Sequence, residues 1–151
     1  ALEDRYGVRT PMQWSADKNA GFSTADHTYL PVIDDAGYGY RELNVATQEE
    51  DDDSYLAWTG FLISTRQSQP ALGAGSLAWV ETGDKAVLAY RRTEGDNGVL
   101  CVFNLTDEAR PSGIILGTAA RDLLDRNGRV YPADVEIQLD PYEALWLLEN
   151  A

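Results

Sequence analysis

The pattern of apolar and polar positions changes along this chain of 151 residues. Residues 1 to about 50 show neither the helical period of 3.6 nor the strand period of 2. Unstructured loops in compact domains rarely exceed about 12–15 residues, yet Gly and Pro interrupt this whole stretch. We therefore expect this half to be mobile, or else to pack its aromatic side chains on the remainder of the chain, on a second copy or on a partner.

A helix is predicted next, from about Asp52 to Gln67, because apolar residues recur there every three or four positions. The acidic run at residues 49–53 is interpreted as its start, with an Asp cap and negative charge at the positive end of the helix dipole. Contiguous carboxylates diverge from one another, so the run is a poor cation site. Pro70 marks the predicted end. The apolar positions of this helix are Tyr55, Leu56, Trp58, Leu62 and Ile63.

From Gly75 onward, short runs are either apolar or alternate between apolar and polar residues, which are the patterns of β-strands. The runs are separated by turn residues, among them two Asn-Gly pairs, the strongest short hairpin signal. This spacing predicts an antiparallel sandwich or meander, with a domain boundary near Leu72–Gly75. The predicted strands are Ser76–Glu81, Ala86–Arg92, Val99–Leu105, Gly113–Leu116, Asp134–Leu139 and Glu143–Leu148, with Asp122–Asp125 as a further candidate.

The composition, 44% hydrophobic and 25% charged, is that of a folded protein. A formal net charge of −13 disfavours nucleic acid and anionic membrane surfaces as partners, because both attract positive potential. The one cysteine, Cys101, lies in an apolar run, so we expect a buried thiol and no intrachain disulfide. No run approaches the roughly 20 apolar residues of a membrane span, and no signal peptide is recognisable, so a cytoplasmic location is expected.

Few residues are candidates for catalysis or metal binding on their type alone. His27 is the one histidine, and it lies in a polar loop without a nucleophile motif nearby, so we do not expect it to be catalytic. One His and one Cys are too few for a zinc site. The glycines are scattered turn residues and form no phosphate-binding loop. The sequence therefore predicts no metal and no cofactor.

The segment from Arg9 to Phe22 is irregular, yet it is rich in large side chains. Pro11 keeps the residue before it out of the helical region, and the Asn-Ala-Gly sequence at residues 19–21 is typical of a turn. Arg9 offers a rigid fork of hydrogen-bond donors. Such a segment is either a packed structural loop or the wall of a binding site. Its large apolar side chains are Met12, Trp14 and Phe22.

Arg-Thr-Pro-Met-Gln-Trp at residues 9–14, followed by Asn-Ala-Gly-Phe at residues 19–22, resembles a loop late in the barrel of α-glucosidase-type members of the α-amylase family. The segment from Tyr29 to Gln48 resembles the trehalose synthases of that family more than its oligo-1,6-glucosidases. Asp140-Pro-Tyr-Glu-Ala-Leu-Trp146 is similar to the last strand of the family's C-terminal β domain. The resemblance thus covers nearly the whole chain.

The resemblance implies an α+β fragment. Residues 1–72 would supply the last loops and helix of a (β/α)8 barrel, and residues 73–151 an antiparallel β-sandwich C-terminal domain. The implied function is that of the C-terminal portion of an enzyme that acts on α-glucosidic bonds with retention, by maltose–trehalose interconversion or by α-glucoside hydrolysis. The family's catalytic motifs, with their Asp and Glu carboxylates, do not occur in this sequence. We therefore assign no catalytic residue and expect this chain alone to be inactive.

The resemblance also implies substrate contacts. Arg9 matches the position that faces the sugar beyond the cleaved bond, where a guanidinium can bracket vicinal hydroxyls. Gln13 and Asn19 are further candidates for polar contact with substrate. The implied partners are an α-linked glucose disaccharide and the catalytic barrel itself, and the exposed apolar anchors also indicate possible self-association.

An alternative function is a non-catalytic accessory β domain with a structural or carbohydrate-binding role. A sugar-binding face on the predicted strands needs exposed aromatic rings that lie in one plane. Strand alternation is expected to bury several of the available rings. The aromatic candidates are Trp79, Tyr90, Tyr131, Tyr142 and Trp146.

Overall fold

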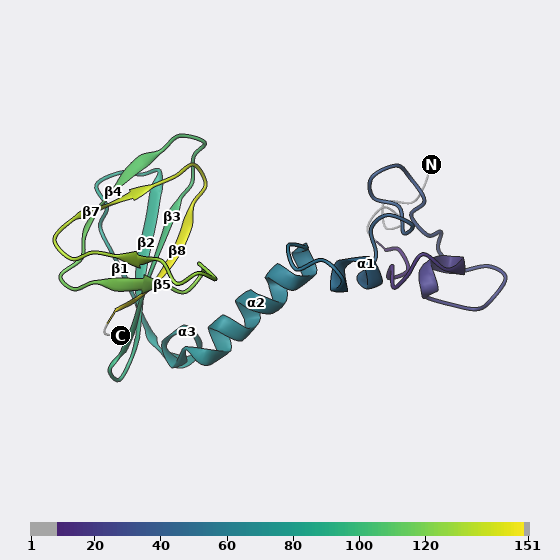
Figure 1. The fold of residues 1–151 in the computed structure, drawn as a ribbon, viewed down its shortest axis with the longest axis horizontal. Helices are drawn as coiled ribbons and strands as arrows, with labels where there is room; N and C mark the ends of the chain where they lie inside the picture. Colours follow the sequence, from purple (N-terminus) through teal and green to yellow (C-terminus); the bar gives the residue numbers. More distant parts are fainter. Residues whose placement is uncertain (1–8, 150–151) are drawn as a thin grey trace. The chain divides into compact units, whose positions relative to one another are not determined.

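The computed structural model describes residues 9–149, in two compact units with the sequence ranges Ala1–Phe61 and Leu62–Ala151. Figure 1 traces the chain from its purple N-terminal part to its yellow C-terminal strand. The described part of the first unit is mostly irregular and contains a 3-10 helix, η1 (Lys18–Gly21), and helix α1 (Val45–Glu49). Neither helix is predicted by the apolar pattern, because each is too short to show a period.

Helix α1 forms because side chains and distant carbonyls satisfy its first amides. The Asn44 side chain accepts a hydrogen bond from the Thr47 amide at 3.0 Å, and the Thr47 hydroxyl accepts one from the Asn44 amide at 3.4 Å. This reciprocal pair is a capping box. The amides of the first two helical residues donate to the carbonyls of Gln13 and Trp14, at 2.9 and 3.0 Å. The helix therefore holds the loop that begins at Arg9.

Helix α2 (Tyr55–Ser68) begins three residues later than predicted, and its cap is a serine rather than an aspartate. The Ser54 hydroxyl accepts from the Ala57 amide at 3.1 Å and donates to the Gln48 carbonyl at 2.7 Å. A carboxylate cannot donate, and Ser54 is only 8% exposed, so an ionised Asp would be costly there. Along α2, no described side chain is buried.

Pro70 does more than mark the end of α2, which stops two residues earlier, because it also begins helix α3 (Pro70–Ala74). Proline suits the first position of a helix, where its missing amide has no intrahelical partner to lose. The Asn97 side chain accepts from the Ala71 amide at 3.0 Å and donates to the Gln69 side chain at 3.1 Å. Five residues are too few for a periodic signal, so the sequence does not predict this helix.

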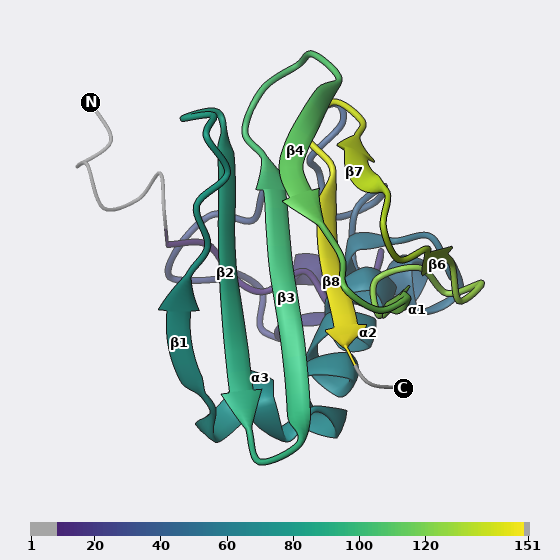
Figure 2. The ribbon, with the colours of Figure 1, turned by 90° about the vertical axis from the view of Figure 1, so that its left-hand side faces the viewer.

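The strands form a six-stranded antiparallel sheet in the order β1-β2-β3-β8-β5-β6 and a two-stranded sheet of β4 and β7. In Figure 2, β1, β2, β3 and β8 lie side by side, and α3 lies at the end of the sheet where β2 finishes. The last strand, β8, is therefore inserted between two earlier ones. The strands are β1 (Ser76–Trp79), β2 (Val87–Glu94), β3 (Asn97–Asn104), β4 (Arg110–Ile115), β5 (Ala120–Asp122), β6 (Val130–Tyr131), β7 (Glu136–Leu139) and β8 (Ala144–Glu149).

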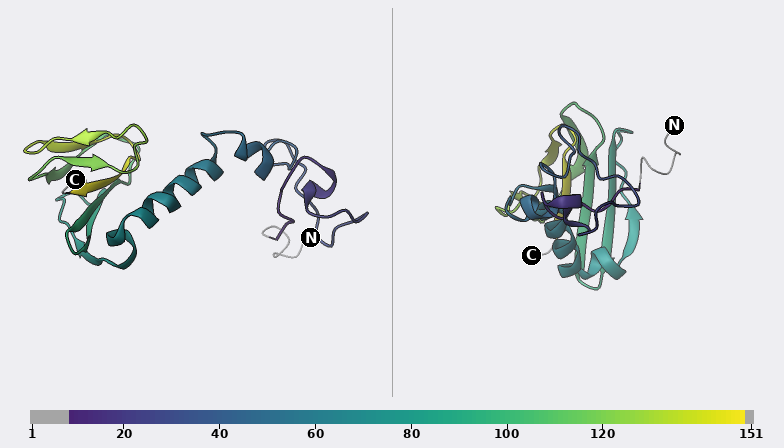
Figure 3. Two further views of the ribbon diagram at one scale, coloured as in Figure 1. Left: turned by 60° about the horizontal axis from the view of Figure 1, so that its bottom comes forward. Right: turned by 90° about the vertical axis from the view of Figure 1, so that its right-hand side faces the viewer.

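Strand alternation divides the buried apolar side chains into two clusters on opposite faces of the large sheet. Leu100 of β3 and Leu147 of β8 belong to the cluster shared with the two-stranded sheet. Figure 3 shows the strands of both sheets in two further views. Cys101 belongs to the other cluster, together with Ala71 and Leu72 of α3. The first cluster contains Val87, Ala89, Leu100, Val102, Ile114, Leu116, Ala120, Tyr131, Ile137, Leu139, Leu145 and Leu147.

The hairpin between β2 and β3 does not turn at Asn97-Gly98, as the Asn-Gly signal indicates. Glu94 pairs with Asn97, so the turn residues are Gly95-Asp96, and Gly95 has a φ of 55°. Asn97 begins β3 because its side chain bonds to the chain around α3. A local turn signal is overridden here by a tertiary contact.

The candidate strand at Asp122–Asp125 is also corrected, since β5 ends at Asp122. One carboxylate oxygen of Asp122 accepts from the Leu124 amide at 2.9 Å and from the Trp146 amide at 3.2 Å. The first of these bonds turns the chain away from the sheet, so the next residues cannot extend the strand. Strand β6, with two residues, gives no alternation signal. The assignment of residues 1–72 to a barrel and 73–151 to a separate β domain stays a prediction.

Candidate functional site

The loop that begins at Arg9 is fastened by the side chain of Gln13. Its amide nitrogen donates to the Leu43 carbonyl and, at 3.3 Å, to the Tyr38 carbonyl. Pro11, two residues earlier, is buried. Both donors of the Gln13 amide are therefore used within the protein, and only its oxygen remains available to a ligand as an acceptor.

Three consecutive residues in this loop, Asn19, Ala20 and Gly21, have left-handed backbone conformations with φ values of 55°, 61° and 68°. Only Gly adopts this region without steric cost, so the run is strained at Ala20. Ala20 is fully buried, and its carbonyl accepts from the amides of Trp14 at 2.8 Å and Ser15 at 3.1 Å. The turn predicted here is thus present, and it closes the loop on itself.

Asn19 contributes the side chain that holds this turn. Its amide nitrogen donates to the carbonyl of Ser23 at 3.0 Å and to that of Ala25 at 2.7 Å. Asn tolerates a positive φ better than most residues. An exposed ion pair between Lys18 and Asp26 at 3.0 Å spans the same segment. These contacts give Asn19 a structural role whatever else it does.

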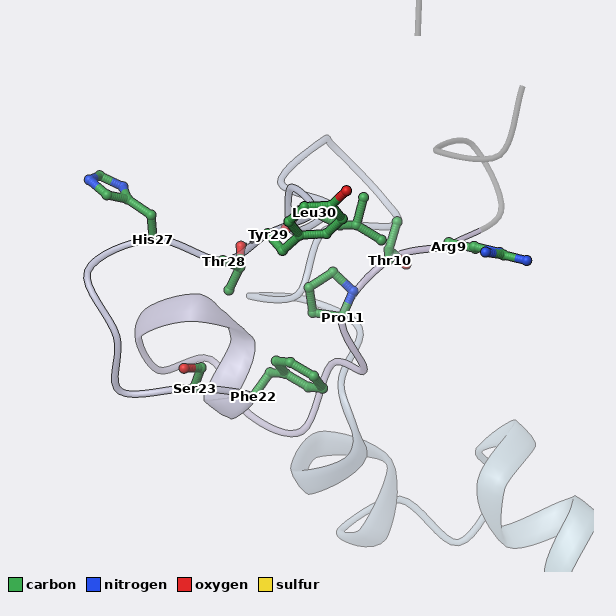
Figure 4. A pocket seen from close by; sticks show the side chains of 9 residues that line it. All are labelled: Arg9, Thr10, Pro11, Phe22, Ser23, His27, Thr28, Tyr29 and Leu30. Atoms are coloured by element: carbon green, nitrogen blue, oxygen red, sulfur yellow. Dashed lines mark hydrogen bonds between the residues drawn. The ribbon is translucent and has the colours of Figure 1, made fainter. Parts of the chain in front are cut away.

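A hollow with a volume of about 350 Å³ opens beside Thr10 and Pro11. In Figure 4, Phe22 and Tyr29 lie around Pro11, whereas Arg9 and His27 point outward at opposite ends. Tyr29 is 94% exposed and Phe22 53%. The lining residues are Arg9, Thr10, Pro11, Phe22, Ser23, His27, Thr28, Tyr29 and Leu30.

A second hollow, of about 340 Å³, shares Thr10 and Pro11 with the first. Gln13 contributes to its lining, but the amide nitrogens of Gln13 and Asn44 already donate to carbonyls of the protein. Its polar groups are therefore largely satisfied without a ligand. The other lining residues are Met12, Ile33, Tyr38, Leu43, Val45 and Gln48.

The structure does not gather the three predicted substrate-binding residues in one place. Arg9 lines the first hollow, Gln13 lines the second, and Asn19 lines neither. Among residues 9–149 no hydrogen bond or ion pair to Arg9 is found, and its side chain points outward at the rim of the first hollow. The sequence reasoning missed Tyr29 and Leu30 as walls of the first hollow, although the Tyr-Leu-Pro motif that contains them was part of the resemblance.

The strand aromatics do not form a flat platform. Trp79 is 66% exposed, but its ring meets that of Tyr90 at an interplanar angle of 82°. Tyr90 and Phe103 are stacked, with 5.9 Å between their centroids, and Tyr131 is only 6% exposed. A sugar ring laid on Trp79 would therefore not continue onto Tyr90.

Three titratable groups of the second unit, those of Asp122, Tyr131 and Cys101, are held in structural surroundings. Burial raises the pKa of the Asp122 carboxyl, and the hydrogen bonds from two backbone amides oppose this rise. Burial, and next the nearby Glu143, raises the pKa of Tyr131 to about 12. The Arg129 guanidinium lies 4.6 Å from the Tyr131 ring centroid and 3.3 Å from a Glu143 oxygen. The buried Cys101 thiol has its pKa raised to about 11, mainly by desolvation.

Within residues 9–149, no three His, Cys, Asp or Glu side chains form a group that could hold a metal ion. The helices of the same residues include none that is long and apolar enough to cross a membrane.

Comparison with known proteins shows the family to which the chain belongs. Residues 2–75 match the family model described as the catalytic domain of alpha amylase. The trehalose synthase/amylase TreS of Mycobacterium tuberculosis (strain ATCC 25618 / H37Rv) is 44% identical over 115 residues, which cover 73% of this chain and 19% of that protein. The chain belongs to the α-amylase family. This membership confirms the resemblance read from the Arg9–Phe22 loop.

The chain is also similar to other members of the α-amylase family, which carry different enzyme names. A trehalose synthase of Pimelobacter sp. (strain R48) is 43% identical over 116 residues, covering 73% of this chain and 20% of that protein. A glucan 1,6-alpha-glucosidase of Streptococcus dysgalactiae subsp. equisimilis is 39% identical over 104 residues, covering 69% and 18%. The chain thus spans about a fifth of the length of these family members.

A solved structure supports the same placement. The trehalulose synthase MutB of Pseudomonas mesoacidophila MX-45 superposes with a TM-score of 0.71 at 27% identity, over 93% of this chain and 25% of that one. A variant of MutB in complex with the substrate sucrose gives a TM-score of 0.70 at 28% identity, with the same coverage. This α-amylase family chain is therefore a mixed helix and antiparallel-sheet structure that matches one region of a larger relative.

Proposed function

We propose that this chain is the C-terminal portion of an enzyme acting on α-glucosidic bonds, by maltose–trehalose interconversion or by α-glucoside hydrolysis. The identity of 44% over 115 residues to a trehalose synthase carries the proposal. Residues 1–72 would end a catalytic barrel, and residues 73–151 would form a β-sandwich domain. Two antiparallel sheets that share one apolar cluster support the second assignment.

In this proposal the chain supplies substrate contacts and no catalytic carboxylate. Arg9 lacks a protein partner among the described residues and stands at the rim of the first hollow. A guanidinium in that position can donate several hydrogen bonds to the hydroxyls of the sugar beyond the cleaved bond. Held by such bonds, a released glucose would remain in place for transfer. Gln13 and Asn19 are weaker candidates, because their donors are already engaged.

A chimeric enzyme tests the proposal. Residues 9–149 would replace the matching segment of the Pimelobacter trehalose synthase, and turnover of maltose, trehalose and an aryl α-glucoside would be measured. We expect an active chimera and an inactive 151-residue chain. Arg9→Ala in the chimera should weaken acceptor binding by about 1.5–3 kcal/mol, the usual value of a hydrogen bond to a charged group, with an unchanged unfolding midpoint. Turnover by the chain alone that disappears when one of its acidic residues is changed would contradict the proposal.

Several finer expectations belong to the same proposal. The exposed anchors Met12 and Trp14, each 51% exposed, favour contact with a barrel or self-association. A single, buried Cys101 and no other cysteine in the sequence suit a cytoplasmic location. The alternative of a sugar-binding accessory β domain has less support, because Trp79 and Tyr90 lie nearly perpendicular.

A further inference from the structure

Tyr29 is the most exposed of the large aromatic side chains in the described structure. Its ring is 94% exposed, and its hydroxyl has no hydrogen-bond partner among the described residues. Phe22, seven residues earlier, is 53% exposed. An aromatic ring that is exposed to water does not gain the favourable free energy of burial. Two exposed rings beside one hollow therefore indicate a surface that binds a ligand or a partner.

The hollow between these rings has the composition of a small-ligand site. Its volume of about 350 Å³ lies within the range of about 300–1,000 Å³ that is usual for ligand pockets. Pro11, Phe22, Tyr29 and Leu30 supply apolar walls, and Arg9 supplies donors at the rim. Apolar walls with a few polar groups at the edge suit an amphipathic ring better than an extended chain or an ion.

Hydrogen bonds hold the backbone of both walls before any ligand binds. Phe22 directly follows the left-handed turn, and its amide donates to the Asn19 carbonyl at 3.0 Å. On the other wall, the Thr28 hydroxyl donates to the Leu30 carbonyl at 2.5 Å and holds the backbone around Tyr29. A preformed site loses less conformational entropy on binding. The second hollow differs, because Gln13 and Asn44 direct their donors to the protein itself.

We propose that Phe22 and Tyr29 form the seat for one glucopyranose ring, with the C–H face of the sugar against the aromatic rings and its hydroxyls toward Arg9. This rests on the proposed function, which makes an α-linked glucose disaccharide the ligand, and it adds the two residues that recognise the ring. Neither Phe22 nor Tyr29 transfers a proton or forms a covalent bond with the substrate, so neither is a catalytic residue. They select for a ring with an apolar face.

Binding of methyl α-glucoside and maltose to the 151-residue chain tests the seat by two-dimensional NMR. We expect saturable shifts at residues 9–11, 22–23 and 28–30. Tyr29→Ala and Phe22→Ala should each weaken binding by roughly tenfold, as truncation of an aromatic contact commonly does. Tyr29→Phe should retain binding, because the ring face is kept. Tyr55→Ala, at a residue of the same unit that is 85% exposed outside the hollow, is the matched control and should bind like the parent.

Sorbitol, an open-chain polyol with similar hydroxyls, separates ring stacking from polar contact and should not shift these residues. The absence of shifts with both sugars, equal shifts with sorbitol, or unchanged affinity in both alanine variants would overturn the seat. The chimeric enzyme shows whether a negative result contradicts the sugar seat or the proposed function. An active chimera whose KM is insensitive to Tyr29→Ala refutes the seat alone, whereas an inactive chimera with intact, Tyr29-dependent sugar binding refutes the enzyme assignment alone.

Discussion

Asn19 offers the sharpest test of how the loop after Arg9 is held. Its side chain donates to the carbonyls of Ser23 and Ala25, and its φ of 55° is unfavourable for most residues. Replacing it with Gly keeps the backbone conformation available and removes both side-chain bonds. Replacing it with Ala removes the same bonds and adds the steric cost of a Cβ in the left-handed region.

The magnitudes follow from these two terms. Two neutral hydrogen bonds contribute about 0.5–1.5 kcal/mol each, and both carbonyls are at least partly exposed, so their loss should cost about 1–2 kcal/mol in either variant. For Asn19→Ala the left-handed penalty adds about 1–2 kcal/mol. The greater freedom that Gly loses on folding, roughly 0.5–1 kcal/mol, offsets part of that difference. Ala should therefore be about 1 kcal/mol worse than Gly.

Native-state hydrogen exchange measures the loss of local stability in both variants at the amides of Trp14, Ser15 and Phe22, whose hydrogen-bond acceptors lie within the turn. A loss of 1–2 kcal/mol corresponds to exchange that is about 5–30 times faster. The amides of β3 lie in the other unit and serve as the internal control. Unchanged protection in Asn19→Gly, or equal protection in the Gly and Ala variants, would refute the role given to this side chain.

Three further outcomes are expected. Gly113→Ala should be severely destabilising in thermal unfolding, because a Cβ there would lie 2.0 Å from the Thr82 carbonyl oxygen. Gly128 has a similar φ of 76° but open space around it, so Gly128→Ala should reduce the free energy of unfolding by only about 1–2 kcal/mol. Cys101 should resist thiol reagents at pH 8 until the protein unfolds, since its pKa is raised to about 11 in a buried site. Asp122→Asn should be more stable than the parent at neutral pH, with the gap closing under acid. A carboxyl whose pKa is raised by burial contributes stability at low pH that is lost as pH rises through that pKa, so a constant difference from acid to neutral denaturant titrations would contradict this.

Apolar runs predicted most of the sheet, because a strand that buries one face repeats every second residue and a strand that buries both faces is apolar almost throughout. β3 and β8 were located to within two residues, since nearly every position of β3 is buried. The short elements escaped prediction for a different reason. Helices α1 and α3 depend on single side chains, Asn44 and Asn97, that satisfy backbone amides, and no period records such a bond.

The candidate site was predictable only in part. The motif at residues 9–14 predicted an irregular loop there, and Arg9 lies at the rim of the first hollow. It could not reveal that the amide donors of Gln13 and Asn19 point into the protein, because that depends on carbonyls up to 30 residues away. Nor does a pattern of residue types locate Tyr29 beside Phe22. Only the path of the chain between them does so.

The position of β8 in the large sheet bears on how the protein is made. β3 pairs with β8 along six residues, so this buried strand lacks one neighbour until β8 has emerged from the ribosome. During synthesis, β1, β2 and β3 can pair in sequence, but β3 then presents an open apolar edge, which invites pairing between chains. A messenger truncated after residue 143 would leave that edge permanently open. Nascent chains of this protein should therefore depend on chaperones most strongly in the interval between the emergence of β3 and that of β8.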